Sequence, residues 1–232
     1  MQKGIKFRIY PNKGQKAFIH QTLGCCRLIY NRGLAMRKEN CEEGKKIGYT
    51  QTSAMLTELK RQEEFAFLKA ADSIALQQSL RDLDRSFVNF FQKRASYPTF
   101  KSKHNRFQSY RTVNQKDNIR IVGRYIKLPK LGFVKIRQSM EVGKINHVTI
   151  EYTPAGKYFA VLNIDFEPEP RPNAGGMIGI DVGIKAFYSD SNGNTVSNPR
   201  YLERSMRKLI REQRRLSGKQ KDSHNRGKQR LR

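Results

Sequence analysis

The chain has 232 residues, of which 46 are Lys or Arg and 20 are Asp or Glu, so its formal net charge at pH 7 is +26. Solubility needs only a few net charges, and a balance this basic therefore indicates a polyanionic partner rather than a merely solvated surface. We expect nucleic acid rather than a membrane, because no basic segment carries the broad apolar face that inserts between lipid headgroups.

Other classes are excluded by what the sequence lacks. The first residues contain no apolar core of a signal peptide, and no run approaches the roughly 18 apolar residues of a membrane-spanning helix. Cys25, Cys26 and Cys41 are odd in number and lack metal-type spacing, and the four histidines are scattered. We therefore expect reduced thiols in the cytoplasm and no zinc site in this chain.

The first part of the chain has one strand pattern followed by helix patterns. Residues 5–10 alternate apolar and basic side chains, which predicts a half-buried strand. An apolar stripe predicts a helix over residues 13–38, and further helices are expected from about Thr50 and from Asp72, which is a typical N-cap residue. Because each apolar stripe has to be buried against another element, we expect the helices to pack together as a small bundle over residues 13–96.

From about residue 97 the apolar period changes to two, which indicates strands. Two short alternating runs flank Gly123-Arg124, and this spacing predicts a two-residue hairpin turn. Three further strands are expected at residues 133–136, 145–152 and 158–166. The pattern is that of an antiparallel meander, and we expect it to close into a small barrel. Residues 169–176, which are rich in Pro and Gly, predict a linker after it.

Met177 to Lys185 is the most informative stretch, because an apolar run ends in Asp181 between two glycines. A buried strand can deliver a carboxylate to a metal site in this way, and Asp181 would then bind Mg²⁺ and help to activate water for phosphodiester cleavage. Alternatively, residues 179–183 would form the phosphate loop of an actin-like ATPase, although that motif usually continues with Thr or Ser and not with Ile184. In the third interpretation the carboxylate only caps a turn.

Two basic regions are candidate nucleic-acid contacts. Between residues 93 and 111 there is no acidic residue, and rings interleave with cations, which suits single-stranded or A-form nucleic acid. We expect two of the rings to be core residues instead. The candidates here are Lys93, Arg94, Lys101, Lys103, Arg106, Tyr110 and Arg111, with Tyr97, Phe100 and Phe107 as further rings.

The second basic region is the tail from residue 200 to residue 232, which carries 13 basic and 3 acidic residues. Leu202, Met206 and Leu209 belong to an apolar stripe at helical spacing. We interpret the tail as a helix that docks on the last domain and turns its cationic face toward a duplex; the alternative is a solvated charged helix. The candidate contacts are Arg207, Arg211, Arg214 and Arg215.

Eight segments match one known family in the same order along the chain, namely residues 7–12, 23–31, 76–91, 97–103, 109–112, 126–132, 156–159 and 178–185. Through them the chain resembles TnpB, a family of RNA-guided nucleases encoded by bacterial insertion sequences and related to type V CRISPR effectors. The resemblance implies an α+β multidomain protein. In it, a small β-barrel (the wedge, residues 1–12 and 97–168) is interrupted by a helical recognition bundle (13–96). A linker (169–176) then leads to the first part of a RuvC/RNase H-like α/β domain (177–232).

The resemblance also implies the partners, which are a guide RNA and a double-stranded DNA target in the bacterial cytoplasm, at the nucleoid. In such systems base pairing reads the sequence and the protein reads a short motif beside the target. Tyr49 and Gln77 match positions that read this motif, and Asp181 falls on the first RuvC carboxylate. Mg²⁺ is the implied cofactor if the site is completed. Nothing in the sequence fixes the oligomeric state.

The chain departs from the family pattern after this point. Full-length relatives continue with a strand that bears a catalytic Glu, a CxxC…CxxC zinc ribbon and a final Asp. We therefore expect a C-terminally truncated TnpB-type protein that binds nucleic acid but has no nuclease activity by itself, since two-metal cleavage needs several carboxylates. Alternatively, the missing carboxylates come from another chain or from a read-through extension. A third hypothesis is a decayed reading frame with an unstable product.

Overall fold

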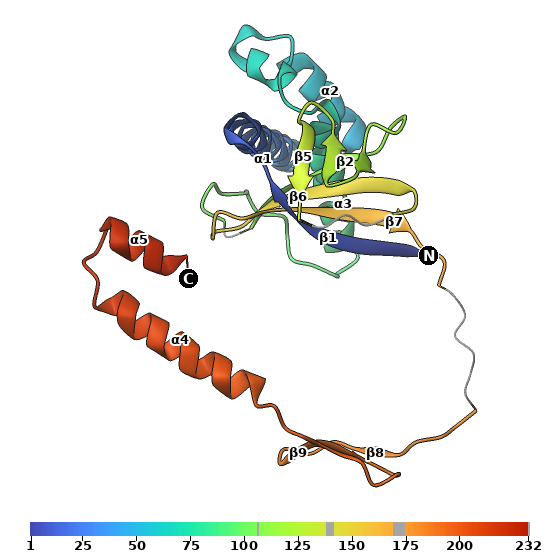
Figure 1. The fold of residues 1–232 in the computed structure, drawn as a ribbon. Coiled ribbons are helices and arrows are strands. Elements are labelled where there is room, and N and C mark those ends of the chain that lie inside the picture. Colours follow the sequence, from blue (N-terminus) through green and yellow to red (C-terminus); the bar gives the residue numbers. More distant parts are fainter. Residues whose placement is uncertain (106, 138–141, 169–174, 232) are drawn as a thin grey trace. The chain divides into compact units, whose positions relative to one another are not determined.

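The computed structural model describes residues 1–105, 107–137, 142–168 and 175–231 (Figure 1). The chain divides into two compact units, Met1–Glu167 and Pro168–Arg232. Of the linker expected at residues 169–176, only Gly175 and Gly176 are among the described residues. Within the described residues, no helix has the length and apolar character needed to cross a membrane.

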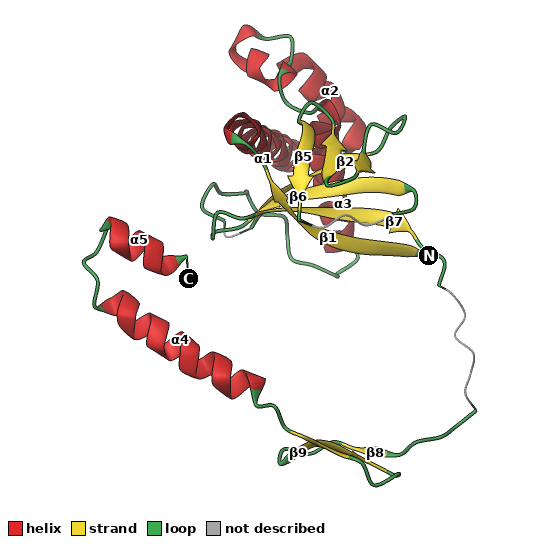
Figure 2. Ribbon diagram, viewed as in Figure 1, coloured by secondary structure: helices red, strands yellow, loops and turns green. Residues whose placement is uncertain are grey.

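The first unit contains a seven-stranded antiparallel sheet with the strand order β2-β6-β7-β1-β5-β4-β3 (Figure 2). Its strands are β1 (Gln2–Tyr10), β2 (Gln108–Val113), β3 (Arg120–Val122), β4 (Tyr125–Leu128), β5 (Gly132–Ile136), β6 (Ile145–Tyr152) and β7 (Tyr158–Asp165). The expected hairpin at Gly123 is confirmed, since Val122 pairs with Tyr125 and Gly123 has a φ of +55°.

The expected closure into a barrel is not shown, because no ladder between described residues joins β2 to β3. Instead, side-chain hydrogen bonds join Asn114, which directly follows β2, to Ile119, which directly precedes β3. The Nδ2 of Asn114 donates to the carbonyl of Ile119 (3.2 Å), and its Oδ1 accepts from the Ile119 N–H (2.9 Å).

Three α-helices and a 3₁₀-helix lie between β1 and β2: α1 (Lys13–Glu42), α2 (Tyr49–Leu59), η1 (Glu63–Lys69) and α3 (Ser73–Phe91). A capping box begins α1, because Asn12 and Gln15 exchange side-chain to backbone hydrogen bonds of 2.8 and 3.0 Å. The expected N-cap of α3 is confirmed, since Oδ1 of Asp72 accepts from the N–H of Ile74 (2.9 Å) and Ala75 (3.4 Å). The short η1 helix was not expected.

Helices and sheet share one hydrophobic core. Buried residues of α1 and α3, such as Ile19 and Leu76, belong to the same cluster as Phe7 and Val134 of the sheet. The helices α1 and α3 approach closely at Gly33, where an added Cβ would lie 2.9 Å from a methyl carbon of Leu83. Phe166 donates its N–H to the Met1 carbonyl (2.8 Å), so the chain enters and leaves this unit side by side.

The second unit contains a three-stranded sheet of order β10-β9-β8 and two helices. Its elements are β8 (Ile180–Asp181), β9 (Ala186–Asp190), β10 (Thr195–Ser197), α4 (Tyr201–Ser217) and α5 (His224–Arg230). The run expected as a buried strand is exposed, with Ile180 59% and Val182 73% exposed, and no residue of α4 is buried. The expected docking of the α4 stripe is therefore not seen, and so small a sheet offers little apolar surface for it.

The cap of α3 gives a first prediction. Asp72→Ala removes the acceptor for two N–H groups and should lower the free energy of unfolding by about 1 kcal/mol. Asp72→Asn keeps an acceptor oxygen and should lose much less. Urea denaturation followed by circular dichroism measures both. An Ala variant as stable as the parent chain would show that Asp72 does not stabilise the helix start.

Candidate nucleic-acid interface

The basic segment between residues 93 and 111 follows α3 and leads into β2. Lys93 and Arg94 are exposed just after α3, and Lys103 is exposed in the loop. Arg106 lies outside the described residues. Lys101 and Arg111 both line one pocket, so the fold brings these two predicted contacts together.

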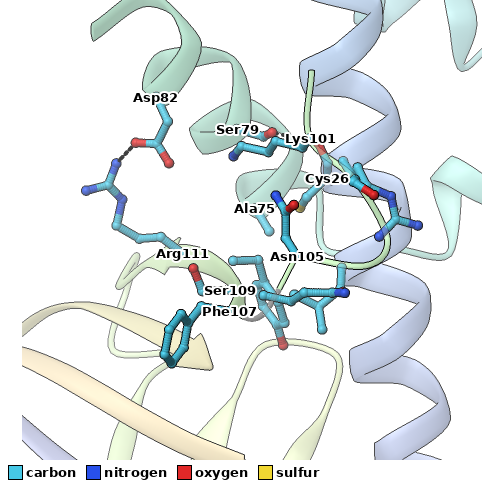
Figure 3. Close-up of a pocket in the computed structure, with 14 residues that line it drawn as sticks. Cys26, Ala75, Ser79, Asp82, Lys101, Asn105, Phe107, Ser109 and Arg111 are labelled. Carbon is cyan, nitrogen blue, oxygen red and sulfur yellow. Dashed lines mark hydrogen bonds and ion pairs between the residues drawn. The ribbon is translucent and has the colours of Figure 1, made fainter. Parts of the chain in front are cut away.

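The pocket lies between α1, α3 and the loop that leads into β2, and it has a volume of about 240 Å³ (Figure 3). Its polar and charged lining includes Arg27, Ser79, Asp82, Lys101, Asn105 and Arg111. Ser79 donates its hydroxyl to the Cys26 carbonyl (2.7 Å), which ties α3 to α1 beneath the pocket. The space is large enough for a phosphate group or one base, and its lining carries three cations against one carboxylate.

Lys101 is held in place from α1. The side-chain amide of Asn31 donates to the Lys101 carbonyl (3.0 Å) and accepts from its N–H (2.8 Å). Part of the Lys101 residue is exposed, but its ammonium reaches inward and lies 4.1 Å from the centroid of the Tyr30 ring. Burial lowers the pKa of Lys101, and the charge of Asp82 offsets this only in part. Among the described residues no carboxylate forms an ion pair with it, so an incoming anion would be favoured here.

Arg111 and Asp82 form an ion pair across the pocket (Figure 3). The Nε of Arg111 is buried and has no hydrogen-bond partner among the described residues, so this guanidinium is only partly satisfied. A polyanion that supplied further acceptors could therefore compete for it.

The rings of the segment divide between core and surface. Tyr110 is 6% exposed and belongs to the core cluster, and burial raises the pKa of its hydroxyl. It is therefore not free to stack on a base. The expectation that two of the rings are core residues is wrong, because Tyr97 is 42% and Phe100 56% exposed. Phe107 is 80% exposed and is the exposed ring that lines the pocket. The alternation of β2 could have predicted the burial of Tyr110, because Tyr110 and Thr112 lie two residues apart and therefore point to the same, buried side of the sheet.

The two positions expected to read a target-adjacent motif lie on neighbouring helices. Tyr49 is the first residue of α2, and Gln77 is exposed on α3. Arg81 follows Gln77 by one turn, and its guanidinium lies 4.7 Å from the centroid of the Tyr49 ring. Arg81 is not among the residues predicted from the sequence, although its spacing of one turn from Gln77 could have suggested it. Together these side chains form a polar and cationic surface beside the α2–α3 contact.

In the second unit, Asp181 is exposed and pairs across the sheet with Ser189. Asp190 pairs with Ile180, and successive side chains of a strand point to opposite faces, so the two carboxylates face opposite sides of the sheet. Asp190 is also engaged in its own turn: Oδ1 accepts from the N–H of Asn192 and Asn194, and Oδ2 accepts from the Asn194 side chain. These hydrogen bonds, chiefly that from the Asn194 side chain, lower the pKa of Asp190.

The described residues contain no group of three or more His, Cys, Asp or Glu that could hold a metal ion. The carboxylates of α4 are engaged elsewhere, since Glu203 pairs with Arg207 and Glu212 pairs with Arg215. One exposed carboxylate does not fit a two-metal centre, because such a centre needs several oxygen ligands to hold ions about 4 Å apart. The residues described here therefore do not fit the metal site that Asp181 suggested.

Helix α4 presents its arginines along one side. Arg211 follows Arg207 by one turn, and the adjacent Arg214 and Arg215 follow Arg211 by one further turn. They surround Ile210 in a shallow depression. The arginines of the α4 ion pairs are largely exposed, whereas the side chain of Glu212 is only 18% exposed. The exposed pair of Arg207 and Glu203 stabilises the helix by at most about 1 kcal/mol, so the Arg207 guanidinium could exchange a carboxylate for a phosphate at little cost.

Two family models match the chain. Residues 1–46 match the helix-turn-helix domain model of IS605 OrfB proteins, and residues 147–232 match the OrfB model described as "Probable transposase". In the structure residues 1–46 form one strand and one continuous helix of 30 residues. A pair of helices joined by a short turn is therefore not formed by this segment alone.

Two relatives match nearly all of this chain, and a third matches less than half of it. A Streptomyces pristinaespiralis protein named "Putative RNA-guided DNA endonuclease" is 35% identical over 99% of this chain and 58% of its own length. InsQ of Escherichia coli K12, which has the same description, is 35% identical over 98% of this chain and 56% of its own length. The virulence protein VsdF of Salmonella dublin is 30% identical over 45% of this chain and 96% of its own length. The chain thus spans little more than half the length of the first two relatives.

The lowered pKa of Lys101 gives a prediction that distinguishes this side chain from the exposed lysines. Its lowered pKa means that it loses its charge at a lower pH than exposed lysines do. A bound phosphate favours the charged form and should move the pKa of Lys101 back upward. Heteronuclear NMR of the methylated amines, titrated with pH and assigned by Lys101→Arg, measures this pKa. A Lys101 signal that titrates with the exposed lysines, both with and without phosphate, would show that the pocket does not desolvate it.

Proposed function

Because the chain belongs to the IS605 OrfB, TnpB-type transposase family, we propose that it binds a guide RNA and a double-stranded DNA target. The observation that carries this proposal is the pocket around Lys101. There a desolvated ammonium has no carboxylate ion pair among the described residues, and two arginines lie beside it. A phosphate that belongs to a polyanion would bind most favourably at this site. The net charge of +26 lets other parts of the chain attract the rest of the same polyanion.

Each basic surface has its own part in the proposal. Lys101, Arg111 and the loop between them contact the phosphate backbone, and the exposed ring of Phe107 stacks on a base beside them. The arginines of α4 contact further phosphates. Tyr49, Gln77 and Arg81 face the short duplex motif beside the target. These partners would place the protein in the bacterial cytoplasm, at the nucleoid.

The same proposal assigns the parts of the fold. The sheet with residues 1–12 and 97–168 corresponds to the wedge, and the helices of residues 13–96 to the recognition bundle. Residues 177–232 correspond to the first part of a RuvC-like domain, with Asp181 as its first carboxylate. The insertion of helices α1, α2, η1 and α3 between β1 and β2 supports the first two assignments, and the position of Asp181 in β8 supports the third.

We further propose that residues 1–232 by themselves bind but do not cleave DNA. Metal-dependent cleavage of a phosphodiester needs several carboxylates around the metal ions. Here Asp181 has no acidic neighbour on its own face of the sheet among the described residues, and Asp190 faces away from it.

Binding should depend steeply on salt. The logarithm of the RNA association constant should fall linearly with the logarithm of the salt concentration, and Lys101→Gln should reduce the slope by about 1. Lys45→Gln, in the exposed loop after α1, is the matched control and should leave the slope unchanged. Filter binding or fluorescence anisotropy over a salt series measures the slopes. A wild-type affinity that does not respond to salt would contradict the proposal.

Cleavage should be absent. The chain, incubated with Mg²⁺, guide RNA and a matching DNA duplex, should shift the duplex in a gel without producing nicks. Asp181→Asn serves as the control for contaminating nuclease. Guide-dependent cutting by the parent chain that disappears in Asp181→Asn would overturn the proposal of a binding-only chain.

A second candidate function follows from the longer relatives. The chain would be the larger part of an RNA-guided DNA endonuclease whose other carboxylates lie in residues outside these 232, in the same or another polypeptide. Mixing the chain with the remaining part of the Streptomyces relative tests this. Guide-dependent cleavage in the mixture that is lost in Asp181→Asn would favour it, and persistent inactivity of a mixture that forms a stable complex would count against it.

A further inference from the structure

One face of the main sheet carries a concentrated positive charge, and its residues are not among the individual contacts predicted from the sequence. Residues 120 to 137, which form β3, β4 and β5, contain six Lys or Arg residues and no Asp or Glu. Lys130 is engaged in the fold, because its ammonium donates to the carbonyls of Lys69 and Ala71 at 2.8 Å. The other five belong to the strands, to the hairpin turn or to the residue that follows β5.

Rings and ammonium groups alternate on this face. Tyr125 of β4 pairs with Lys135 of β5, and Lys127 of β4 pairs with Phe133 of β5. Because residues that pair directly point to the same side of a sheet, these four side chains form a two-by-two pattern of rings and cations. Lys135 also pairs with Tyr10 of β1. We call Tyr10, Tyr125, Lys127, Phe133 and Lys135 the ring–lysine face.

The three rings are half-exposed, whereas their strand neighbours form the core. Tyr10 is 48%, Tyr125 47% and Phe133 50% exposed. Ile126 and Val134, which point to the other side, are buried. The rings therefore do not complete the core.

Arg8 fixes one ring of the face and adds charge beside it. Its guanidinium lies 5.5 Å from the centroid of the Tyr10 ring and 5.4 Å from that of Phe159. Such cation–π contacts hold a ring at one side and leave the rest of it open. Neighbouring strands are about 4.8 Å apart, so Tyr10 and Tyr125 lie on the order of 10 Å apart, with Lys135 between them.

We propose that the ring–lysine face binds unpaired, single-stranded nucleic acid, with bases stacked on Tyr10, Tyr125 and Phe133 and phosphates at Lys127 and Lys135. Single-strand binding surfaces combine a cationic track with rings in this way, because every base has a face that can stack. A duplex fits less well, since its bases already stack on one another. The inference rests on the proposed function, because it names which part of a bound nucleic acid meets this face.

Ring and lysine pairs across strands also stabilise a sheet, and the experiment must separate the two roles. The double variant Tyr125→Ala/Phe133→Ala should weaken binding of a short oligouridine by about fivefold or more, since stacking is worth at least about that factor per base. Its salt slope should stay at the wild-type value, and its affinity for a hairpin duplex should not change. Phe91→Ala, which removes a ring that is 74% exposed on α3, is the matched control.

The lysines should respond differently from the rings. Lys127→Gln/Lys135→Gln should reduce the salt slope for oligouridine by about 1 to 2, because two phosphate contacts are lost. Fluorescence anisotropy measures all affinities, and thermal melts monitored by circular dichroism show whether each variant is folded. Oligodeoxyuridine of the same length tests whether the strand is RNA or DNA. Weakened binding of either strand by the ring variant supports the inference.

The outcomes separate this inference from the proposed function. If the parent chain binds oligouridine with a salt-dependent affinity but the folded ring variant binds it as tightly as Phe91→Ala does, the ring–lysine face is not the binding surface. Equal losses for single strand and duplex would also overturn the inference. A parent chain that binds no nucleic acid at all would overturn the proposed function itself.

Discussion

The position of β1 in the middle of the main sheet is the constraint on which the first unit depends. β1 pairs with β7 from Gln2 to Ile9 and with β5 at Ile9 and Tyr10, although these partners lie more than a hundred residues away in the chain. The helices between β1 and β2 must therefore return the chain to the sheet, and they do so by sharing its core. The positions of the pocket and of the ring–lysine face both follow from this. The pocket forms where α1 and α3 contact the loop that leads into β2, and the ring–lysine face forms where β5 pairs with β1.

Local signals in the sequence predicted local structure. The hairpin at Gly123, the N-cap Asp72 and the strand and helix that flank Asn12 depend on neighbouring residues, and all are present. The strand order, the pocket and the face on Tyr10 and Tyr125 depend on pairing between distant segments. A sequence pattern shows which side chains of a strand share a face, but it does not show which strands lie beside it. The residues of these sites were therefore not predicted together.

Tyr110 and Asp181 show that a sequence pattern can predict the wrong burial, since one is more buried and the other more exposed than expected. Tyr110 was named as a contact because it lies among cations, but the parity of β2 turns it into the core. Asp181 was expected at the end of a buried strand, yet the three-stranded sheet around it is small and exposes its apolar residues. In both cases residue type predicted the chemistry, and the packing decided whether the side chain could use it.

The hydrogen bond between Phe166 and Met1 has a practical consequence for handling the protein. The two ends of the first unit lie side by side, which is the arrangement in which circular permutation and domain insertion are best tolerated. Any segment attached ahead of Met1, such as an affinity tag or a fluorescent protein, would emerge next to the exit toward the second unit. A reporter placed at an internal loop such as the one at residues 153–157, between β6 and β7, would avoid that crowding.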